Sequence, residues 1–540
     1  MFYRQRTLSS RSRPIAPAAE TITLPASTGG VNALDPLIAT PQQDCYYTFN
    51  LMPSEYGLRL RKGYREWATN IGTDPYTDVR GVIPFEGTDP ANNKLFAATA
   101  DGIYDVTTDG ETSPTKVVTY TVNDDDAGFV TWCEMTVNTT PAETYLFVAC
   151  PRNGAWQYTE STGVWARPSW TNVTVANVAF VGLHKQRLWV IEAGQADAWY
   201  SPVASVAGAF TRFVFGSKFK YGGDLVGMYN WTLDGGDGVD DYMIAIGRGG
   251  DVLVYRGQDP ADATTWELTG SFFIGKIPQS RRIATEYAGE LYLLSVFGVT
   301  SVRDLVSGVD PSDTGRGPSA KINRILRPEV KENIAENAWQ LLVNPSDGFL
   351  QILQPWQDFG SARQYVQNLL TGAWGYWSNV PVISADTWQT EYYLGSENGV
   401  LYAYDGALDG TTASTPGAAI DYSILTSFQA LGAHGQYKQI GLMRVVAVAS
   451  GDATYNMKAI YDYDLSPSIG APPGGGATAA AVWDSALWDA AIWDGELNGQ
   501  SFLEGAAGIG RVAAIAMKGQ ASDRLTIIGW DLTLTKGGFL

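Results

Sequence analysis

KLFAATADGIYDVT, residues 94–107, joins an alternating apolar strand to a Gly/Asp turn and a second short strand that carries an aromatic residue. The same pattern recurs through most of the chain, at residues 143–158, 185–200, 241–257, 289–302, 348–377 and 391–406. Alternation with a period of two predicts half-buried strands, and Gly supplies the positive φ that tight turns need. A repeat of this kind every forty to sixty residues is typical of a β-propeller, in which each repeat forms one blade.

Each repeat has an apolar or aromatic anchor on what we expect to be its first strand. The anchors are Leu95, Leu146, Leu188, Ile244, Leu291, Leu350 and Tyr393. Their spacing of 42 to 59 residues suits four-stranded blades with loops of varying length. Irregular intervals around 206–242 and 303–339 can hide or absorb strands, so six, seven and eight blades stay open. We predict an all-β fold with a propeller over residues 67–410.

AKINRILRPEVKENIAENAW, residues 320–339, departs from strand periodicity. Ile322, Ile325, Leu326 and Val330 lie near helical spacing on both sides of Pro328. We expect a short helix inserted in a loop.

The two ends of the chain lack the repeat. Residues 1–66 contain a Pro/Ser-rich arm and a predicted strand in which Leu58 and Leu60 alternate with Arg59 and Arg61. Residues 411–540 predict three strands between 420 and 462, and two more around a GQASD turn near the end. We expect these segments to form a platform, with residues 411–540 as a β-sandwich-like domain.

Charge is distributed unevenly along the chain. The net charge is −19, yet residues 1–66 carry eight basic and five acidic side chains, whereas residues 67–540 carry 29 basic and 51 acidic ones. An acidic body argues against a protein that grips nucleic-acid phosphates. The basic residues of the leading segment are our candidates for partner binding, because Arg pairs bidentately with carboxylates; for the strand at 58–61 a solvated face is an equal alternative. The candidates are Arg4, Arg6, Arg11, Arg13, Arg59, Arg61, Lys62 and Arg65.

Cysteines and apolar segments limit the class of protein. Cys45, Cys133 and Cys150 are widely spaced without a CxxC pair, which favours buried thiols in a reduced compartment. No stretch reaches 18 apolar residues, so no membrane span is expected. The first 19 residues lack the apolar core of a secretory signal; their acid-free, Arg/Ser-rich composition leaves a transit peptide as the alternative to a docking arm.

The sequence gives little support for an enzymatic function. The two histidines, His184 and His434, fall in different predicted units, and GxSxG, HExxH and CxxC patterns are absent from the sequence. We expect no enzyme activity, metal or cofactor. A propeller glycosidase needs only carboxylates, but neither S-x-D-x-G-x-T-W boxes nor an arginine triad is visible. A glycan-binding or glycan-hydrolysing propeller is kept as the alternative function, and a monomeric scaffold as a third.

Two short motifs have plainer explanations. GGDGVDDY, residues 235–242, fits one copy of a calcium-binding nonapeptide with Asp237 and Asp240 as ligands. Such ions are held between several stacked copies, so a Gly/Asp loop is favoured. The Trp-Asp pairs that begin at Trp483, Trp488, Trp493 and Trp530 all lie beyond the predicted propeller, which argues against a WD40 protein.

One resemblance covers most of the chain. EYGLRLRKGYREWATNI (55–71) is followed by VRGVIPFEG and the first repeat, and the chain closes with KQIGLMRVVAV, a WD-rich loop and DLTLTKGGFL. In this order and style it resembles the tail nozzle proteins of short-tailed bacteriophages. The resemblance implies a propeller with a platform domain, assembled as a homo-hexamer below the adaptor ring of the tail. It implies a structural, non-enzymatic protein of the virion tail, made in the host cytoplasm, with contacts to tail fibres or a tip protein.

The resemblance also implies a lumen through which double-stranded DNA is retained and ejected without specific binding. Duplex DNA carries one negative charge per about 1.7 Å. An acidic wall repels the phosphates and lets the duplex slide. The basic leading segment would then contact the adaptor ring or a neighbouring subunit.

Overall fold

The computed structural model of the chain describes residues 19–234, 239–355, 363–432, 434–450, 453–471, 498–500 and 503–539. Regular structure in these residues is almost entirely strand, which confirms the all-β prediction. Within the described ranges, helical structure is limited to α1 (Val302–Val306), α2 (Asn323–Glu332) and 3-10 turns at Pro90–Asn92, Val175–Asn177, Gly216–Lys218 and Ala320–Ile322.

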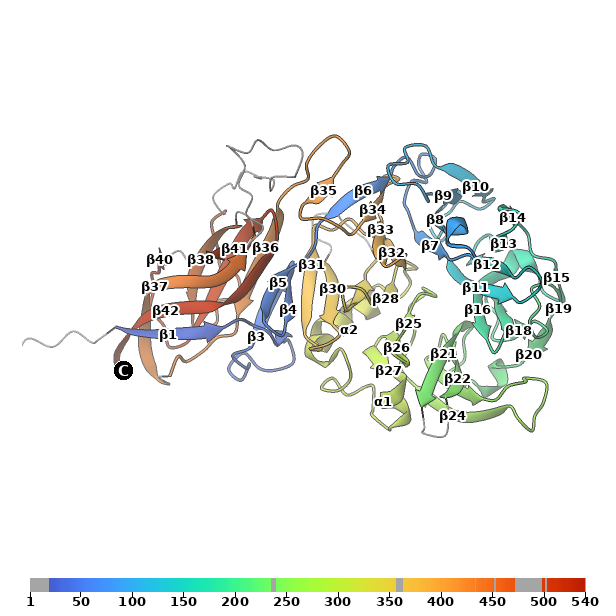
Figure 1. Cartoon of the computed structure of the whole chain (residues 1–540). Coiled ribbons are helices and arrows are strands. Elements are labelled where there is room, and N and C mark those ends of the chain that lie inside the picture. Colours follow the sequence, from blue (N-terminus) through green and yellow to red (C-terminus); the bar gives the residue numbers. More distant parts are fainter. Residues whose placement is uncertain are drawn as a thin grey trace, which may run out of the picture.

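Seven mainly antiparallel sheets, built from the described residues between 64 and 411, lie around a common axis (Figure 1). We call them the sheet ring and number its sheets in chain order. Sheet 1 is β7–β10 (Gly81–Phe85, Lys94–Thr99, Gly102–Asp105, Thr115–Thr119) and sheet 2 is β11–β14 (Thr131–Val137, Glu143–Cys150, Gly154–Thr159, Val164–Ala166). Sheet 3 is β16–β18 with β20 (Val178–His184, Arg187–Glu192, Ala198–Tyr200, Thr211–Phe213), and sheet 4 is β21–β24 (Leu225–Asp234, Val239–Gly247, Asp251–Arg256, Glu267–Phe273).

The remaining sheets continue around the axis. Sheet 5 is β25–β27 (Ala284–Tyr287, Glu290–Ser295, Gly298–Ser301) and sheet 6 is β28–β31 (Gln340–Asn344, Phe349–Leu353, Arg363–Asn368, Trp374–Ser378). Sheet 7 is β32–β34 (Ser384–Trp388, Glu391–Gly395, Leu401–Ala403) with β6 (Tyr64–Ala68) and β35 (Asp409–Thr411). A small parallel pair, β15 (Trp170–Thr171) and β19 (Gly208–Ala209), lies beside the ring.

The seven anchors of the sequence pattern fall on seven different sheets, one on each. They lie on the second strand of each sheet, β8, β12, β17, β22, β26, β29 and β33, so the expectation that they mark first strands is wrong. Second strands have sheet neighbours on both sides and are deeply buried, and five of the seven anchors have no exposed surface. Their apolar signal is therefore the strongest in each repeat.

The ring is closed by a strand from the N-terminal side of the chain. β6 pairs antiparallel with β34, with Leu401 opposite Ala68 and Ala403 opposite Arg65. The predicted boundaries at residues 66 and 410 thus fall inside β6 and β35 of sheet 7. Closure requires this, because pairing the first strand with the last sheet removes an open edge.

The expected helix between sheets 5 and 6 is confirmed as α2, which includes Pro328. Its buried face is Asn323, Leu326 and Val330, and Ile322 in the preceding 3-10 turn is also buried. Sheet 5 has three strands, and α1 follows β27 directly. The helical insertion stands where the other sheets add a fourth strand.

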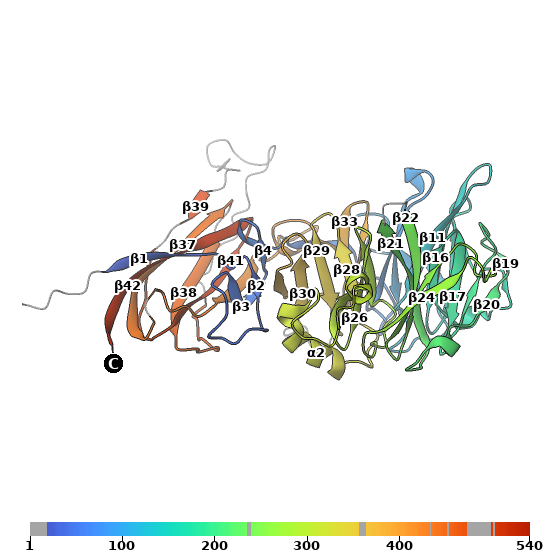
Figure 2. The ribbon, with the colours of Figure 1, turned by 90° about the horizontal axis from the view of Figure 1, so that it is seen from below.

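The N- and C-terminal segments together form a β-sandwich beside the ring (Figure 2). One layer contains β1 (Glu20–Pro25), β4 (Leu51–Ser54), β5 (Gly57–Leu60), β37 (Gln436–Ala449), β39 (Asn498–Gln500), β40 (Leu503–Gly505) and β42 (Leu525–Phe539). The other contains β2 (Gly30–Val31), β3 (Asp44–Phe49), β36 (Ile420–Thr426), β38 (Ala453–Tyr461) and β41 (Ala513–Ala521). Met443 and Trp530 of the first layer share one buried cluster with Ile424 and Met517 of the second.

The second layer of the sandwich is continuous with sheet 6 of the ring. The strand order β28-β29-β30-β31-β3-β36-β41-β38 forms one nine-stranded sheet with β2, joined where Phe49 of β3 lies opposite Tyr376 of β31. Asn50, fully buried with φ 60, donates to the carbonyls of Ser378 (3.1 Å) and Asp421 (2.7 Å). Ring and sandwich therefore share backbone pairing, a hydrophobic cluster and a buried hydrogen-bonding residue.

Candidate functional site

Arg61, one of the predicted partner-binding residues, is buried where the ring meets the sandwich. Its two terminal nitrogens donate to both carboxylate oxygens of Asp409 at 2.6 Å, and its Nε donates to the Asn50 side chain at 2.9 Å. The Arg61 side chain has no exposed surface. Burial raises the pKa of Asp409, and the Arg61 pair partly offsets that rise. Arg61 is thus an internal structural residue, and its assignment to a free partner surface is wrong.

Lys62 and Arg65 lie on the surface near Arg61, each with a carboxylate of its own chain. Lys62 Nζ is 2.8 Å from Asp347, and 44% of the Lys62 side chain is exposed. Arg65 donates to Asp109 at 2.8 Å, a bond that raises the pKa of Arg65. Exposed pairs of this kind contribute little to stability, so Lys62 can exchange its partner at small cost.

Arg59 is exposed and lines a cleft of about 490 Å³ between the ring and the sandwich. The cleft wall from the ring contains Asp405, Gly406 and Ala407, and the wall from the sandwich contains Asp523, Arg524 and Thr526. Thr526 of β42 lies directly opposite Arg59 of β5, which places Arg524 near Arg59. The sequence missed Arg524, since only the pairing of β5 with the C-terminal strand brings it to Arg59.

A smaller cavity of about 80 Å³ adjoins the cleft and shares Arg59, Leu60, Arg61 and Lys62 with it. Its floor is aromatic: the Trp377 ring lies 4.9 Å from that of Tyr404 and 5.0 Å from that of Phe349. The Lys62 ammonium is 5.9 Å from the Tyr404 ring. We call the cleft and this cavity together the junction groove, a cationic groove with an apolar end.

The other four candidates, Arg4, Arg6, Arg11 and Arg13, lie outside the described residues. The structure therefore places Arg59 and Lys62 in one groove, pairs Arg65 with Asp109 and buries the side chain of Arg61.

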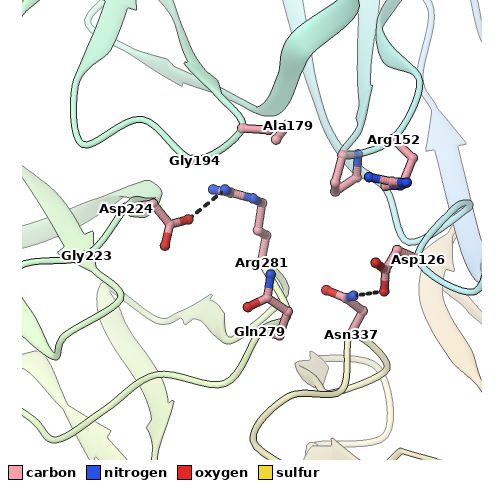
Figure 3. Close-up of a pocket in the computed structure, with 11 residues that line it drawn as sticks. Asp126, Arg152, Ala179, Gly194, Gly223, Asp224, Gln279, Arg281 and Asn337 are labelled. Carbon is pink, nitrogen blue, oxygen red and sulfur yellow. Dashed lines mark hydrogen bonds and ion pairs between the residues drawn. The ribbon is translucent and has the colours of Figure 1, made fainter.

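A second hollow, of about 540 Å³, lies on the axis of the ring (Figure 3). Its residues come from the loops of sheets 1 to 6 and, for Ala179, from the start of β16, and we call it the axial cup. They are Asp126, Pro151, Arg152, Ala179, Ala193, Gly194, Gly223, Asp224, Gln279, Arg281 and Asn337. Each charged residue of the cup has a partner: Arg281 donates to Asp224 at 3.0 Å, Asn337 donates to Asp126 at 2.5 Å, and Arg152 donates to Asp124 at 2.6 Å. Burial and the nearby Arg248 lower the pKa of Arg281 to about 10.

Side chains from sheets that are not direct neighbours meet at the centre of the ring. Arg282, just before β25 of sheet 5, donates to the carbonyl of Arg80 at the start of sheet 1 at 2.9 Å. Its guanidinium lies 5.2 Å from the Phe129 ring, and Arg80 lies 5.3 Å from the same ring. Trp132 of sheet 2 donates to Asp386 of sheet 7 at 3.2 Å. We call these five residues the axial plug, because they bridge the ring across its axis.

Two carboxyls on the inner strands have strongly raised pKa values. Burial raises the pKa of Asp386 to about 7, although hydrogen bonds from Thr387 and Trp132 and the charge of Arg282 oppose the rise. Burial raises the pKa of Glu134 to about 7 as well, against a backbone hydrogen bond from Glu86. Both groups are therefore partly protonated at neutral pH, which reduces their negative charge.

The histidines and the two short motifs noted in the sequence form no functional site in the described residues. His184 is buried and its Nδ1 lies 2.7 Å from the Asn230 side chain, whereas His434 is exposed. Residues 235–238 of the calcium-like motif, Asp237 included, and the Trp-Asp pairs at 483–494 lie outside the described residues. Among the side chains that the structure does describe, no group of three or more His, Cys, Asp or Glu could hold a metal ion. No described helix is long and apolar enough to cross a membrane.

Comparisons with known proteins give no family. Neither a family model nor a curated protein matches the chain. Among solved structures, the extracellular domain of a protein described as a one-component system of B. thetaiotaomicron matches 74% of this chain and 43% of its own length, with 12% identity and a TM-score of 0.36. PorZ, a surface component of the type-IX secretion system of Porphyromonas gingivalis, matches 71% of this chain and 44% of its own length, with 9% identity and a TM-score of 0.35. This chain thus spans less than half of either structure, and similarity at this level supports no statement about function.

Proposed function

We propose that the chain is a structural subunit of a tubular assembly, the distal nozzle of a short phage tail, in which the sheet ring is a seven-bladed β-propeller and the sandwich is its platform. The carrying observation is the axial plug. Arg282 joins sheet 5 to sheet 1 at 2.9 Å, and Trp132 joins sheet 2 to sheet 7 at 3.2 Å, so side chains from four sheets fill the centre and a duplex cannot pass through the ring of one chain. A DNA conduit built from this chain must run between several copies.

The connection between the ring and the sandwich supports the proposal that the chain forms part of the wall of a tube. One nine-stranded sheet runs from sheet 6 into the sandwich, and a single buried cluster spans both parts. A subunit of a tube has to resist bending between its parts, and shared backbone pairing gives that resistance. The fused architecture is thus better suited to a wall than to a pair of hinged binding domains.

The charge of the body also supports a conduit. Residues 67–540 carry an excess of 22 negative charges. Surfaces of this sign repel phosphates, so DNA would be neither bound nor slowed by ion pairs.

The test is the mass and shape of the purified full-length chain. We expect a six-fold ring with an open central channel wide enough for duplex DNA, seen by native mass spectrometry and by electron microscopy down its axis. A chain that stays monomeric at all concentrations, or that hydrolyses glycans, contradicts the proposal.

A glycan-binding protein is the second candidate, and the axial cup favours it. The cup has a volume of about 540 Å³, within the range of small-molecule sites, and offers the exposed Gln279 together with Asn337 and Arg152. Among the described residues, no aromatic side chain lines it to stack on a sugar face, and its charged side chains already have partners within the chain. The ring assembly is therefore the first candidate.

A further inference from the structure

The junction groove has more cationic capacity than its own contacts use. Lys62 is paired with Asp347 at 2.8 Å on the surface. For Arg59 and Arg524, both exposed, the described part of the chain provides no ion pair. Asp523 accepts a hydrogen bond from the backbone nitrogen of Arg524 at 2.7 Å, a contact that leaves the guanidinium out. Two arginines facing one cleft without carboxylates of their own provide a docking surface for anions.

We propose that the junction groove receives a carboxylate-bearing segment of a second copy of this chain, so that Arg59 and Arg524 form the contact between neighbouring subunits. The inference rests on the proposed assembly and assigns one of its interfaces. Lys62 is the third cation of the contact, and the cavity over Phe349, Trp377 and Tyr404 takes an apolar side chain of the same segment.

The groove suits protein carboxylates better than nucleic-acid phosphates. Asp405 and Asp523 stand in its walls, and a phosphate backbone with one charge per few ångströms would meet them as well as the arginines. A single carboxylate can lie between the two guanidinium forks and avoid both acids. The apolar end of the groove adds a reason, because it fits a side chain and offers nothing to a sugar-phosphate strand.

A second copy supplies the required chemistry. Residues 67–540 of each chain have 51 acidic side chains against 29 basic ones. A neighbouring copy therefore presents more carboxylates than cations to the groove. The groove is not self-complementary, since its unpaired side chains are cationic and its proposed ligand is acidic. A contact of one surface with a different surface is heterologous, and repetition of such a contact closes into a ring when the rotation allows it.

The first experiment measures association of the full-length chain by sedimentation at several concentrations. We compare the wild type, the double variant Arg59→Ser/Arg524→Ser and the control Arg303→Ser. Arg303 is also an exposed arginine, with its side chain 59% exposed, but it lies in α1 on sheet 5. We expect the double variant to associate at least about tenfold more weakly, with an unchanged melting temperature, because interface charge pairs of this type contribute that much affinity. The control should match the wild type.

The second experiment identifies the occupant. A carbodiimide couples a lysine amine to a carboxylate in contact with it, and an equal mixture of ¹⁴N- and ¹⁵N-labelled chains separates links within a chain from links between chains. Lys62 to Asp347, at 2.8 Å, is the internal reference for a same-chain link. We expect a further link from Lys62 to a carboxylate of the other isotope in about half of the events, as random mixing of two labels requires.

Each outcome decides something. If the wild type never associates, the proposed function fails and this inference fails with it. If the wild type forms rings and the double variant does so equally well, or if every Lys62 link stays within one chain, this inference is overturned and the proposed function stands. If the variant assembles normally but loses binding to a short DNA duplex, the groove is a phosphate site and the inference is likewise overturned.

Discussion

Arg59 and Arg61 are two residues apart on the chain, and burial separates their roles. Arg59 is exposed in the junction groove, while the Arg61 side chain is fully buried with Asp409 and Asn50. A buried charge is retained only when it is paired and hydrogen-bonded, and loss of one partner of such a pair typically costs about 3–5 kcal/mol. Arg61 therefore stabilises the joint between ring and sandwich, and Arg59 is available to another molecule.

Asp386 is the residue at which folding stability should respond most clearly to pH. Its pKa rises from the usual 3.8 to about 7 because the fold buries it, so the native state binds a proton more tightly than the unfolded chain does. Stability from this group is fully present below pH 3.8 and is lost as pH rises through 7. In either protonation state, a side-chain oxygen of Asp386 accepts the hydrogen bond from Trp132.

We predict that Asp386→Asn becomes more stable relative to the wild type as pH rises from 4 to 7, and that the difference levels off above 7. The difference is up to about 4 kcal/mol, since each pKa unit corresponds to about 1.4 kcal/mol. Asparagine keeps an oxygen for Trp132 and cannot ionise. Urea unfolding at each pH measures the effect.

The control for this measurement is a carboxyl whose pKa moves in the opposite direction. Burial would raise the pKa of Glu160, but hydrogen bonds from Asn92 and Thr88 outweigh it and lower the pKa to about 2. Stability from Glu160 is present above pH 4.5 and is lost as pH falls towards 2, so Glu160→Gln should weaken the fold most at neutral pH. A stability difference for Asp386→Asn that stays constant between pH 4 and 7 would contradict the assignment.

The local sequence could predict that residues 59–65 are cationic. It could not predict which of these side chains are buried or what they contact. Arg59 and Arg61 alternate with Leu58 and Leu60, which indicated that both point to the same polar face. The pairing that buries Arg61 comes from Asp409, 348 residues later. Arg524 is brought to Arg59 by the pairing of β5 with β42, which are still further apart in the sequence. Contacts of this range are set by topology, and one sequence contains no local signal for them.

The short strand β6 determines whether the ring is closed. It supplies the fourth strand of sheet 7 from the N-terminal side and so closes the ring. Gly63, directly before it, donates its backbone N–H to the carbonyl of Gly406 at 2.9 Å, and Tyr64 donates to Leu408 at 3.0 Å. The strand lies so close to residues 406–408 that no side chain fits at Gly63.

We predict that Gly63→Ala lowers the free energy of unfolding by about 1–3 kcal/mol, the usual cost of overpacking. A Cβ at this position would lie 2.1 Å from the carbonyl oxygen of Leu408, and backbone must move to accept it. Denaturant unfolding measures the loss. Gly505→Ala in β40 is the matched control, because a Cβ there meets nothing within 4 Å. Equal stabilities of the two variants would show that β6 tolerates displacement.

The repeat predicted the elements of the ring well because each sheet contains one strand with a strong apolar signal. Leu95 and Leu188, for example, are fully buried on β8 and β17. The same logic recovered α2 from the spacing of Leu326 and Val330. Inner strands were harder to recognise: β25 carries Glu286 and β32 carries Asp386, so strands facing the axis do not follow simple alternation. Closure by β6 could not be read from residues 64–68 alone.

At the scale of the whole molecule, the nine-stranded sheet makes ring and sandwich one mechanical unit. The join between β3 and β31 has a single register pair, Phe49 with Tyr376, so the backbone link is narrow. Asn50 reinforces it: besides its bonds to Ser378 and Asp421, its side-chain oxygen accepts from Arg61 at 2.9 Å. One buried amide thus connects strands of the ring, the sandwich and the segment that precedes β6.

We predict that Asn50→Gly separates the unfolding of ring and sandwich. Glycine accepts the φ of 60 without strain, so the variant loses only the side-chain hydrogen bonds and leaves Arg61 short of one acceptor. Scanning calorimetry should show one cooperative transition for the wild type and two for the variant, because domains with a weakened interface unfold independently. Asn153→Ala is the control: Asn153 is buried and bonded to Thr121 and Val122 inside the ring, so its loss should lower the melting temperature and keep a single transition. One transition in both variants would mean that the sheet and the shared core couple the two parts without Asn50.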